Sequence, residues 1–474
     1  MQKKTIVAWV ALPLLIALGC ASHPDKATAS APTPAPTPKP NIVVVLADDL
    51  EPRSSGLLPR LPALMNATGT TFTRSYVVQS LCGPSRASLL TGQYAHNHGV
   101  IYNDVPAGGF PFFIPHESST VATWLKGAGY RTALVGKYIN GYPHGAADDY
   151  VPPGWDYWYG HLSGFADHRY YDYWTNDNHV VSQHGGTTDE YSTTVETKKA
   201  VDYINSVAGA PEPIFLYLAP EAPHTPVFYT DTHASGFRDA QCARVPSFNE
   251  SNVHDKPAWV QGIPYMTPAD VDHCDELEQS RLKSMRYVEE ELEAVLIALQ
   301  ATGRMDRTFV FYTSDNGLLM GEHRAVDRKD NFYEEAIGVP LIVRGPGVPA
   351  GRSLAHPVLN IDLAPTFAEL AGIPVPETVD GRSLLPLLGA SPPGLDAWRT
   401  DFLVESFADS ASLGLRNAGW LYDELSSGEK ELYDMAKDPY QTENLQRTAD
   451  PAFIAPLHAR LAALQSCKGA SCSR

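Results

Sequence analysis

The residues Ile42–Leu46 form an unbroken apolar and mostly β-branched run, IVVVL, near the start of the chain. A strand without a polar face must be covered on both sides, which is typical of the inner strands of a parallel sheet. Parallel strands need crossover connections, so such a chain has to alternate strands with helices. The acidic pair Asp48-Asp49 follows Ala47 directly, at the strand end where ligand sites of open α/β sheets gather.

Further strand and helix patterns alternate along the chain, which has 474 residues, 43% of them apolar. We expect strands at Thr132–Val135, Ile214–Leu218, Thr308–Tyr312 and Val339–Val343, and helices at Thr120–Gly129 and Arg281–Gln300. This alternation predicts an α/β fold, with a large, mixed but mainly parallel sheet sandwiched by helices. The segment Asp167–Asn178, rich in Tyr, Trp and Asp, is expected to be a surface loop over a site.

The character of the chain changes after about Pro392. We expect short strands at Phe402–Glu405 and Gly419–Tyr422 and a terminal helix at Asp450–Gln465, which predict a smaller C-terminal α+β subdomain. The predicted boundaries are therefore a large α/β domain at 41–391 and a smaller subdomain at 392–474.

The N-terminus predicts export. Lys3 and Lys4 precede an apolar stretch that is short for a membrane span, and Gly19-Cys20 ends it. The pattern resembles a lipoprotein-type signal peptide at 1–20; the alternative is an ordinary secretory signal with an incidental cysteine. The Pro-rich segment 21–40 predicts an extended tether. We expect an exported protein, lipid-anchored to a bacterial cell envelope or otherwise periplasmic or secreted.

The formal net charge of −18 argues against a nucleic-acid partner, because phosphate contacts need clustered Lys and Arg. It argues weakly against an extended polyanion as well. A local basic pocket is still compatible with one anionic group.

Acidic side chains follow two of the predicted strands. Asp48 and Asp49 follow the first, and Asp315 and Asn316 follow Thr308–Tyr312 after a short gap. Hard cations such as Ca²⁺ and Mg²⁺ prefer carboxylate and amide oxygens. Each cluster alone is more simply a turn or a helix cap. The two together, each after a buried strand, favour a metal site.

The most specific segment is Leu81–Gly92, LCGPSRASLLTG. Pro84 suits the first turn of a helix that Gly92 would end. Cys82 would then lie where backbone N–H groups favour an anion. A lone cysteine is more often a small buried apolar residue, but the motif around Cys82 is far more specific than a lone cysteine.

This segment resembles the modification motif of the sulfatase family, in which a separate formylglycine-generating enzyme oxidises the cysteine to formylglycine, an aldehyde also called 3-oxoalanine. The resemblance covers most of the chain from Asn41 onward. It extends to Asp48-Asp49, Gly136-Lys137-Tyr138, Ala222-Pro223-His224, Thr313–Gly317, Lys329, Val339–Gly347 and Leu432–Leu445.

Within the family, the chain is most similar to N-acetylglucosamine-6-sulfatases and the related heparan endosulfatases. The segments that carry this likeness are Gly92–His98, Gly136–Asn140, Pro152–Trp155 and Tyr170–Tyr173. One position departs from the wider family, because many arylsulfatases have a His where Ile139 stands. Ile139 cannot donate a proton, so that role is lost or carried by Asn140 or another residue. The likeness suggests a 6-O-sulfated amino sugar such as N-acetylglucosamine-6-sulfate as the substrate.

The resemblance implies a mechanism. Formylglycine at position 82 would be hydrated to a geminal diol, one hydroxyl would attack sulfur, and the aldehyde would re-form as sulfate leaves. It also implies roles for individual residues. One cation, Ca²⁺ or alternatively Mg²⁺, would be held by Asp48, Asp49, Asp315 and Asn316 with the modified Cys82. Arg86 would steady the diol, Lys137 and Lys329 would bind sulfate oxygens, and His224 would protonate the leaving oxygen.

Outside this set, His96, His98 and Asn103 are expected on the substrate side, and the role of His323 is open. If Cys20 carries lipid and Cys82 is catalytic, Cys242, Cys274, Cys467 and Cys472 remain. They allow three connectivities, of which Cys242–Cys274 with Cys467–Cys472 is our prediction.

Two other functions stay open at this point. The first is a phosphonate or phosphodiester hydrolase of the same superfamily, which would share the fold and the metal carboxylates. The second is a catalytically inactive, lipid-tethered protein that binds glycans. The complete set of predicted site residues favours an active sulfatase.

Overall fold

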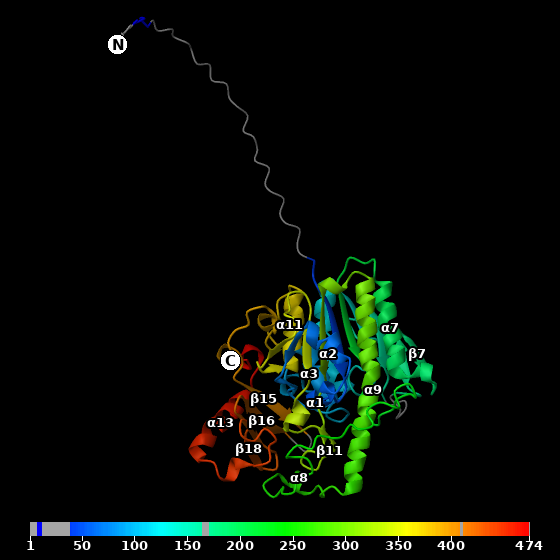
Figure 1. Cartoon of the computed structure of the whole chain (residues 1–474), viewed down its shortest axis with the longest axis vertical. Coiled ribbons are helices and arrows are strands. Elements are labelled where there is room, and N and C mark those ends of the chain that lie inside the picture. The colour runs from blue at the N-terminus through cyan, green and yellow to red at the C-terminus, as the bar shows by residue number, and fades with distance from the viewer. Residues whose placement is uncertain (1–6, 12–37, 164–169, 408–410, 474) are drawn as a thin grey trace, which may run out of the picture. The chain divides into compact units, whose positions relative to one another are not determined.

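The computed structural model describes residues 7–11, 38–163, 170–407 and 411–473 (Figure 1). The predicted signal peptide at 1–20 and tether at 21–40 lie largely outside these ranges. Lys39–Arg474 form one compact unit. In the described part of the chain, no helix combines the length and the apolar character that crossing a membrane requires.

A ten-stranded sheet organises this unit. Its strands, in spatial order, are β13 (Arg352–Leu354), β2 (Thr70–Phe72), β12 (Leu341–Arg344), β9 (Thr308–Ser314), β1 (Asn41–Ala47), β8 (Ile214–Ala219), β4 (Arg131–Gly136), β5 (Tyr157–His161), β6 (Trp174–Asp177) and β7 (Val180–Gln183). The inner strands β9, β1, β8, β4 and β5 run parallel, and antiparallel pairs flank them. The predicted mixed, mainly parallel sheet is confirmed.

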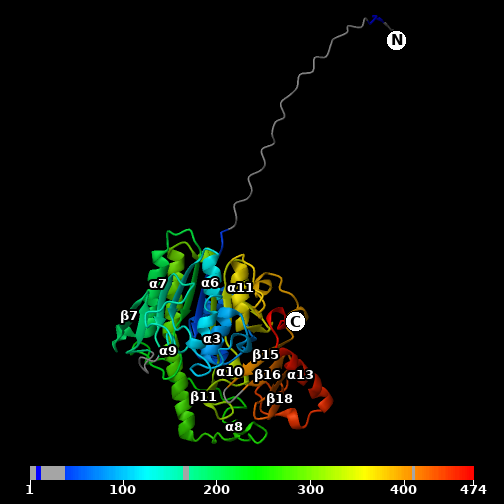
Figure 2. The ribbon, with the colours of Figure 1, turned by 180° about the vertical axis from the view of Figure 1, so that it is seen from behind.

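Side chains of β1 alternate between two apolar layers. Ile42 and Leu46 belong to the layer under the helices on one face, and Val43 and Val45 to the layer on the other. The first face is covered by α3 (Cys82–Thr91), α6 (Val121–Gly127) and α11 (Leu363–Leu370), and the second by α7 (Ser192–Ser206) and α9 (Pro268–Ala301). Figure 1 shows α7 and α9 in front of the sheet, and Figure 2 shows α3, α6 and α11 from behind. The unbroken apolar run is thus covered on both faces, as its sequence requires.

The long helix α9 begins earlier than its apolar pattern predicts. It starts at Pro268, where the Thr267 side chain accepts a hydrogen bond from the backbone N–H of Asp270. The early turns carry mainly polar residues and are held by the disulfide Cys242–Cys274 rather than by a long apolar stripe. Periodicity alone could not find this part of the helix.

A second, four-stranded antiparallel sheet forms the predicted C-terminal α+β part (Figure 1). It consists of β15 (Asp401–Ser406), β16 (Ser412–Asn417), β17 (Trp420–Glu424) and β18 (Lys430–Asp434), and α13 (Pro451–Leu464) packs on it. The sequence predicted β15, β17 and α13 but not β16 and β18. The second disulfide, Cys467–Cys472, follows α13, so the predicted cysteine pairing is confirmed.

One prediction was wrong in part. The expected surface loop Asp167–Asn178 contains β6, which pairs with β5 and β7 at the edge of the large sheet. Its aromatic residues pack against the sheet instead of covering a site; Tyr170 and Tyr173 are buried. Residues 167–169 lie outside the described residues.

The remaining short elements connect these layers. They are α1 (Pro52–Gly56), α2 (Leu61–Leu64), β3 (Ser75–Tyr76), α4 (Ala95–His98), α5 (Phe110–Phe113), α8 (Ala258–Gln261), β10 (Leu319–Met320), β11 (Val326–Arg328), α10 (Glu334–Ile337), β14 (Val358–Leu359) and α12 (Leu385–Leu388).

Candidate active site

The parallel strands β1 and β9 end side by side, with Ala47 opposite Ser314. Because of this register, Asp49 lies against the residues that follow β9. Its backbone N–H donates to Asp315 Oδ1 at 3.1 Å, and Asn316 Nδ2 donates to Asp49 Oδ1 at 2.6 Å. Asp49 adopts a positive φ of 69°, an uncommon conformation that the surrounding hydrogen bonds hold in place. The two acidic clusters therefore form one site.

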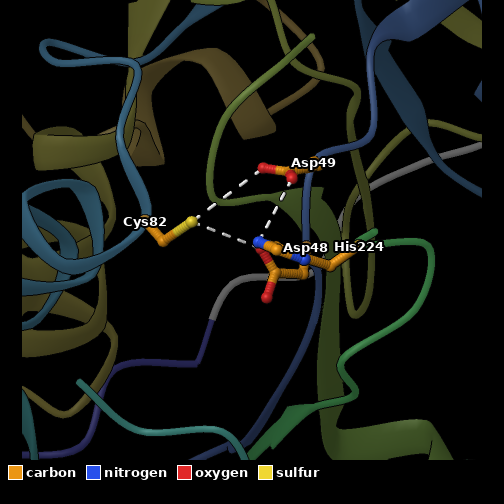
Figure 3. A group of neighbouring side chains, drawn as sticks. All are labelled: Asp48, Asp49, Cys82 and His224. Atoms are coloured by element: carbon orange, nitrogen blue, oxygen red, sulfur yellow. Dashed lines mark hydrogen bonds and ion pairs between the residues drawn. The ribbon is translucent and has the colours of Figure 1, made fainter. Parts of the chain in front are cut away.

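Cys82 is the first residue of α3 and is fully buried. Its Sγ lies 3.5 Å from Asp48 Oδ1 and 3.9 Å from Asp49 Oδ1 (Figure 3). On the other side of the pair, His224 Nε2 lies 3.6 Å from Asp49 Oδ2. One ligand atom from each of these four residues falls within 4.8 Å of the others, a spacing that can hold a metal ion.

Arg86 lies one turn along α3 from Cys82 and is also fully buried. Its Nε donates to Asp315 Oδ2 at 2.8 Å, and its guanidinium lies 3.6 Å from Asp48 Oδ2. It also donates to the backbone carbonyl of Lys137 at 2.9 Å. A single guanidinium thus fixes side chains from the ends of β1 and β9 and the backbone after β4.

Two lysines approach the carboxylates from different segments. Lys137, which directly follows β4, donates a hydrogen bond to Asp48 Oδ2. Lys329, which follows β11, places its Nζ 2.6 Å from Asp49 Oδ1 and 2.9 Å from Cys82 Sγ. Both ammonium groups are therefore beside the position where the Cys82 side chain ends.

The charges of the site set its protonation states. Burial disfavours ionisation of Asp48 and Asp49, but the nearby lysines and His224 outweigh it and hold the pKa of both carboxyls below its ordinary value. Burial also raises the pKa of the Cys82 thiol to about 12. The thiol is therefore protonated at neutral pH and is a poor nucleophile as it stands.

The pKa of His224 is lowered, unlike that of the Cys82 thiol. Burial lowers its pKa, and Asp49 and Asp48 only partly offset that effect. Its Nδ1 faces the backbone carbonyl of Thr225 as a hydrogen-bond donor, which leaves Nε2 turned toward Asp49. The imidazole can thus present one nitrogen to the site.

The donor atoms suit a hard cation. Asp49 Oδ2 and Asn316 Oδ1 are both buried and lack a hydrogen-bond partner among the described residues. An orphaned buried oxygen is costly unless a ligand satisfies it. Carboxylate and amide oxygens match Ca²⁺ or Mg²⁺ better than a thiol does. The oxygens of Asp315 already pair with Arg86 and Asp49, but each carboxylate oxygen can accept a second partner.

A cavity of about 670 Å³ adjoins Lys329, between the strands of the C-terminal sheet and the segment around α8. Asp330, Asn331 and Trp259 line it. Asp330 Oδ1 and Asn331 Nδ2 are buried and have no hydrogen-bond partner among the described residues. Sequence analysis missed these residues, because no motif marks them beyond their place directly after Lys329.

Several other histidines have structural contacts. His98 is buried and shares a hydrogen bond with Ser88, and His96 bonds Glu405 at 2.9 Å. His323 bonds Glu250 at 2.8 Å and stacks on Tyr333. The described contacts of His96 and His98 are with Glu405 and Ser88 and not with Cys82, so their expected place on the substrate side stays a prediction.

Asn103, in contrast, is close to the site. Its Oδ1 accepts a hydrogen bond of 2.8 Å from the backbone N–H of Gly83, in the first turn of α3.

Comparison with known families agrees with this geometry. The family model described as Sulfatase matches residues 40–373, and a model described as N-sulphoglucosamine sulphohydrolase, C-terminal, matches residues 321–467. The chain belongs to the sulfatase family. It is accordingly a sulfuric ester hydrolase, and the predicted family and enzyme class are confirmed.

Two curated sulfatases illustrate the relationship. The chain is 32% identical to N-acetylglucosamine-6-sulfatase of Homo sapiens over 91% of this chain and 85% of that protein. It is 33% identical to the Extracellular sulfatase SULF-1 homolog of Drosophila melanogaster, over 81% of this chain but 34% of that longer protein.

Solved structures show the same fold. One solved protein, in complex with that protein's own substrate D-glucosamine-2-N,6-O-disulfate, superposes with a TM-score of 0.73 at 24% identity. The match covers 90% of this chain and 96% of that one. A phosphonate monoester hydrolase from Silicibacter pomeroyi superposes with a TM-score of 0.72 at 25% identity, covering 90% and 94%. The fold therefore accommodates both sulfate and phosphonate chemistry.

Proposed function

We propose that this sulfatase hydrolyses sulfate esters of sugars through a formylglycine made from Cys82 and one divalent cation. The observation that carries the proposal is the place of Cys82. It lies at the start of α3, with its Sγ near Asp48, Asp49 and Lys329. Since the buried thiol has its pKa raised to about 12, an unmodified Cys82 would be unreactive there.

The chain's own residues supply binding and proton transfer. Asp48, Asp49, Asp315 and Asn316 would hold the cation, and Arg86 would keep Asp315 and Asp48 in place. When present, a hydrated formylglycine supplies a hydroxyl nucleophile, and a bound Ca²⁺ or Mg²⁺ supplies positive charge beside it.

The substrate is held and the leaving group protonated by the remaining residues. Lys137 and Lys329 would bind sulfate oxygens, because both ammonium groups lie at the Cys82 end of the site. His224 Nε2 would donate a proton to the leaving sugar oxygen.

The substrate class follows from the relatives and the cavity. The N-acetylglucosamine-6-sulfatase relatives favour a 6-O-sulfated amino sugar. The cavity beside Lys329 offers Trp259 as an apolar surface for a ring, and Asn331 Nδ2 and Asp330 Oδ1 as unpaired partners for hydroxyl or amide groups.

Maturation is tested first by mass spectrometry of the peptide that contains Cys82, from protein made in a host with a formylglycine-generating enzyme. We expect formylglycine or its hydrate. A wholly unmodified thiol in an active enzyme would exclude this mechanism. The Cys82→Ala variant should fold normally and have no turnover; an equally inactive but fully modified wild type would instead favour a glycan-binding protein.

The rival function is phosphonate monoester hydrolysis, which the Silicibacter pomeroyi relative in fold makes concrete. Matched 4-nitrophenyl sulfate and 4-nitrophenyl phenylphosphonate distinguish the two. We expect a higher kcat/KM for the sulfate, and a clear preference for the phosphonate would overturn the proposal. Among sugars, cleavage of N-acetylglucosamine-6-sulfate is expected, and its failure alongside cleavage of other sulfated sugars would exclude the amino-sugar assignment.

The N-terminal segment 1–40 completes the proposal, with Cys20 lipid-modified and residues 21–40 holding the enzyme away from a bacterial membrane. Membrane fractionation of the wild type and of Cys20→Ala tests this. We expect loss of membrane association in the variant. If the variant and the wild type partitioned alike, Cys20 would not be the lipid anchor, and an unlipidated periplasmic or secreted enzyme would be favoured.

A further inference from the structure

A buried arginine links the long helix α9 to the backbone of Asp49. Arg281 is 1% exposed, and its guanidinium donates a hydrogen bond to the backbone carbonyl of Asp49. The same guanidinium pairs with Glu51 Oε2 at 2.9 Å and with Glu278 Oε2 at 3.4 Å. Since Glu278 belongs to the early, polar turns of α9, the part of the helix that no apolar stripe explains helps to hold this arginine in place.

The backbone conformation of Asp49 requires such support. Its φ of 69° lies in the left-handed region, which a residue with a side chain occupies only when its surroundings hold it there. Arg281 holds the carbonyl of the peptide group that follows Asp49, and the N–H of that group, which belongs to Leu50, donates to Ser314 Oγ at 2.9 Å. The N–H of Asp49 itself donates to Asp315 Oδ1. Both peptide groups beside the Asp49 Cα are therefore fixed, and so is the direction in which its side chain leaves the backbone.

We propose that Arg281 is a positioning residue for the cation: it holds the Asp49 backbone so that the buried Oδ2 is presented to the metal ion. This inference rests on the proposed function, because it assumes that Asp49 is a cation ligand. Asp49 Oδ1 accepts hydrogen bonds from Asn316 and Lys329, whereas Oδ2 is buried without a hydrogen-bond partner in the described part of the chain. A rotation of the Asp49 backbone would displace this oxygen.

The sign of the effect separates positioning from simple electrostatics. Arg281 is a positive charge near the proposed cation site, so its removal should by charge alone strengthen the binding of a cation. Glu51 and Glu278, which it neutralises, would then add negative charge and act in the same direction. Loss of positioning acts in the opposite direction, because a ligand oxygen that is no longer held in place binds the ion more weakly. Weaker cation binding without Arg281 is thus expected from positioning and not from charge.

Isothermal titration calorimetry with Ca²⁺ tests the proposal on the matured enzyme after a chelator has removed its metal. The variants are Arg281→Met, which removes the donor and the charge, and Arg281→Lys, which keeps the charge but not the planar fork. We expect Arg281→Met to raise the Kd for Ca²⁺ about 10- to 100-fold, the usual cost of losing a group that orients a metal ligand. The Kd of Arg281→Lys should fall between those of Arg281→Met and the wild type. The rise in the unfolding midpoint on addition of Ca²⁺ should shrink in the same order.

Arg304 provides the matched control, since it is equally buried and also binds backbone carbonyls, but at the other end of β1. It is 0% exposed and donates to the carbonyls of Ala210 at 2.8 Å and Glu212 at 3.2 Å. It also donates to Oδ1 of Asn41, the first residue of β1, at 3.3 Å. Arg304→Met should therefore lower the free energy of unfolding, as Arg281→Met does, while it leaves the Kd for Ca²⁺ within about twofold of the wild-type value.

An unchanged or lower Kd in Arg281→Met would overturn the proposal. An equal rise in Arg304→Met would overturn it as well, because general loosening of the fold would then be enough to weaken cation binding. If Arg281→Met does not fold, Arg281→Lys decides alone: a raised Kd supports positioning, and an unchanged Kd overturns it. A wild-type enzyme that binds neither Ca²⁺ nor Mg²⁺ would refute the cation of the proposed function instead, so the two failures are distinguishable.

Discussion

Replacing Arg86 with leucine should destabilise the metal-free protein strongly, because a buried carboxylate loses its counter-charge. Arg86 is fully buried and pairs with Asp315 at 2.8 Å and with Asp48 at 3.6 Å. Asp48 keeps Lys137 as a hydrogen-bonded partner after the substitution, whereas Asp315 loses its ion pair and retains only weaker electrostatic attraction from lysines such as Lys137. The loss is therefore that of one broken buried pair and not of two.

Removing one partner of a buried ion pair costs about 3–5 kcal/mol. With Asp48 still compensated, we expect the lower end, about 3 kcal/mol, in the free energy of unfolding at pH 8. The loss depends on pH. The pKa of Asp315 is raised to about 7 even with Arg86 present, because burial outweighs the guanidinium. An acidic group whose pKa is higher in the folded than in the unfolded state destabilises the protein as the pH rises above the unfolded-state pKa. The stability lost on Arg86→Leu should therefore shrink at pH 5.

Equilibrium urea unfolding in the presence of a chelator measures this, with tryptophan fluorescence as the signal. Arg460→Leu is the matched control, because Arg460 and Asp401 form a partly exposed pair, which should contribute less than a fully buried one. The Arg86→Leu, Asp315→Leu double variant should recover most of the loss. A loss below about 1 kcal/mol, or one that grows toward pH 5, would refute the argument that Asp315 depends on Arg86.

Four further predictions concern activity and cation binding. His224→Ala should lower kcat about 10²- to 10⁴-fold on a sugar sulfate. The loss should be much smaller on 4-nitrophenyl sulfate, because nitrophenolate leaves without a proton. Equal losses in the steady-state rates on the two substrates would show that His224 is not the acid. Because burial lowers the pKa of His224, with Asp49 opposing, kcat on the sugar should fall as the pH rises through that lowered value, and a pH–rate profile with an alkaline optimum would contradict this. Removal of the cation with a chelator should abolish turnover and lower the unfolding midpoint. Ca²⁺ at about 100 times its Kd should then restore about 2.7 kcal/mol of unfolding free energy, and no effect of either treatment would show that no cation is bound. Asn331→Ala should reduce kcat/KM for the sugar about tenfold and leave the aryl sulfate unchanged; equal effects on both would place Asn331 outside the sugar site.

Local sequence determines much of this site. The apolar run before Asp48 requires an inner strand, and the pattern Thr308–Tyr312 places a second strand before Asp315. Parallel neighbours bring their carboxyl ends to one edge, so the two acidic clusters could be expected to meet. Pro84 and Gly92 likewise bound a helix around the motif, and α3 runs from Cys82 to Thr91.

What the sequence could not predict depends on tertiary neighbours. The start of α9 is polar and is held by a disulfide to Cys242, so no apolar period marks it. Asn331 belongs to a cavity completed by Trp259 and by residues of the C-terminal sheet, far away in the sequence. Spacing carries no signal for contacts of this kind.

The acidity of the whole chain and the anionic substrate are compatible because the site inverts the charge locally. A net charge of −18 is spread over the molecule, and exposed charges beyond about 8–10 Å are largely screened at physiological ionic strength. The cations at the site are buried or nearly so: Arg86 is fully buried, Lys137 is 5% exposed, and Lys329 contacts Cys82. Buried charges are screened far less, so they dominate the field at the sulfate position. The acidic surface therefore affects the approach of the substrate more than its binding.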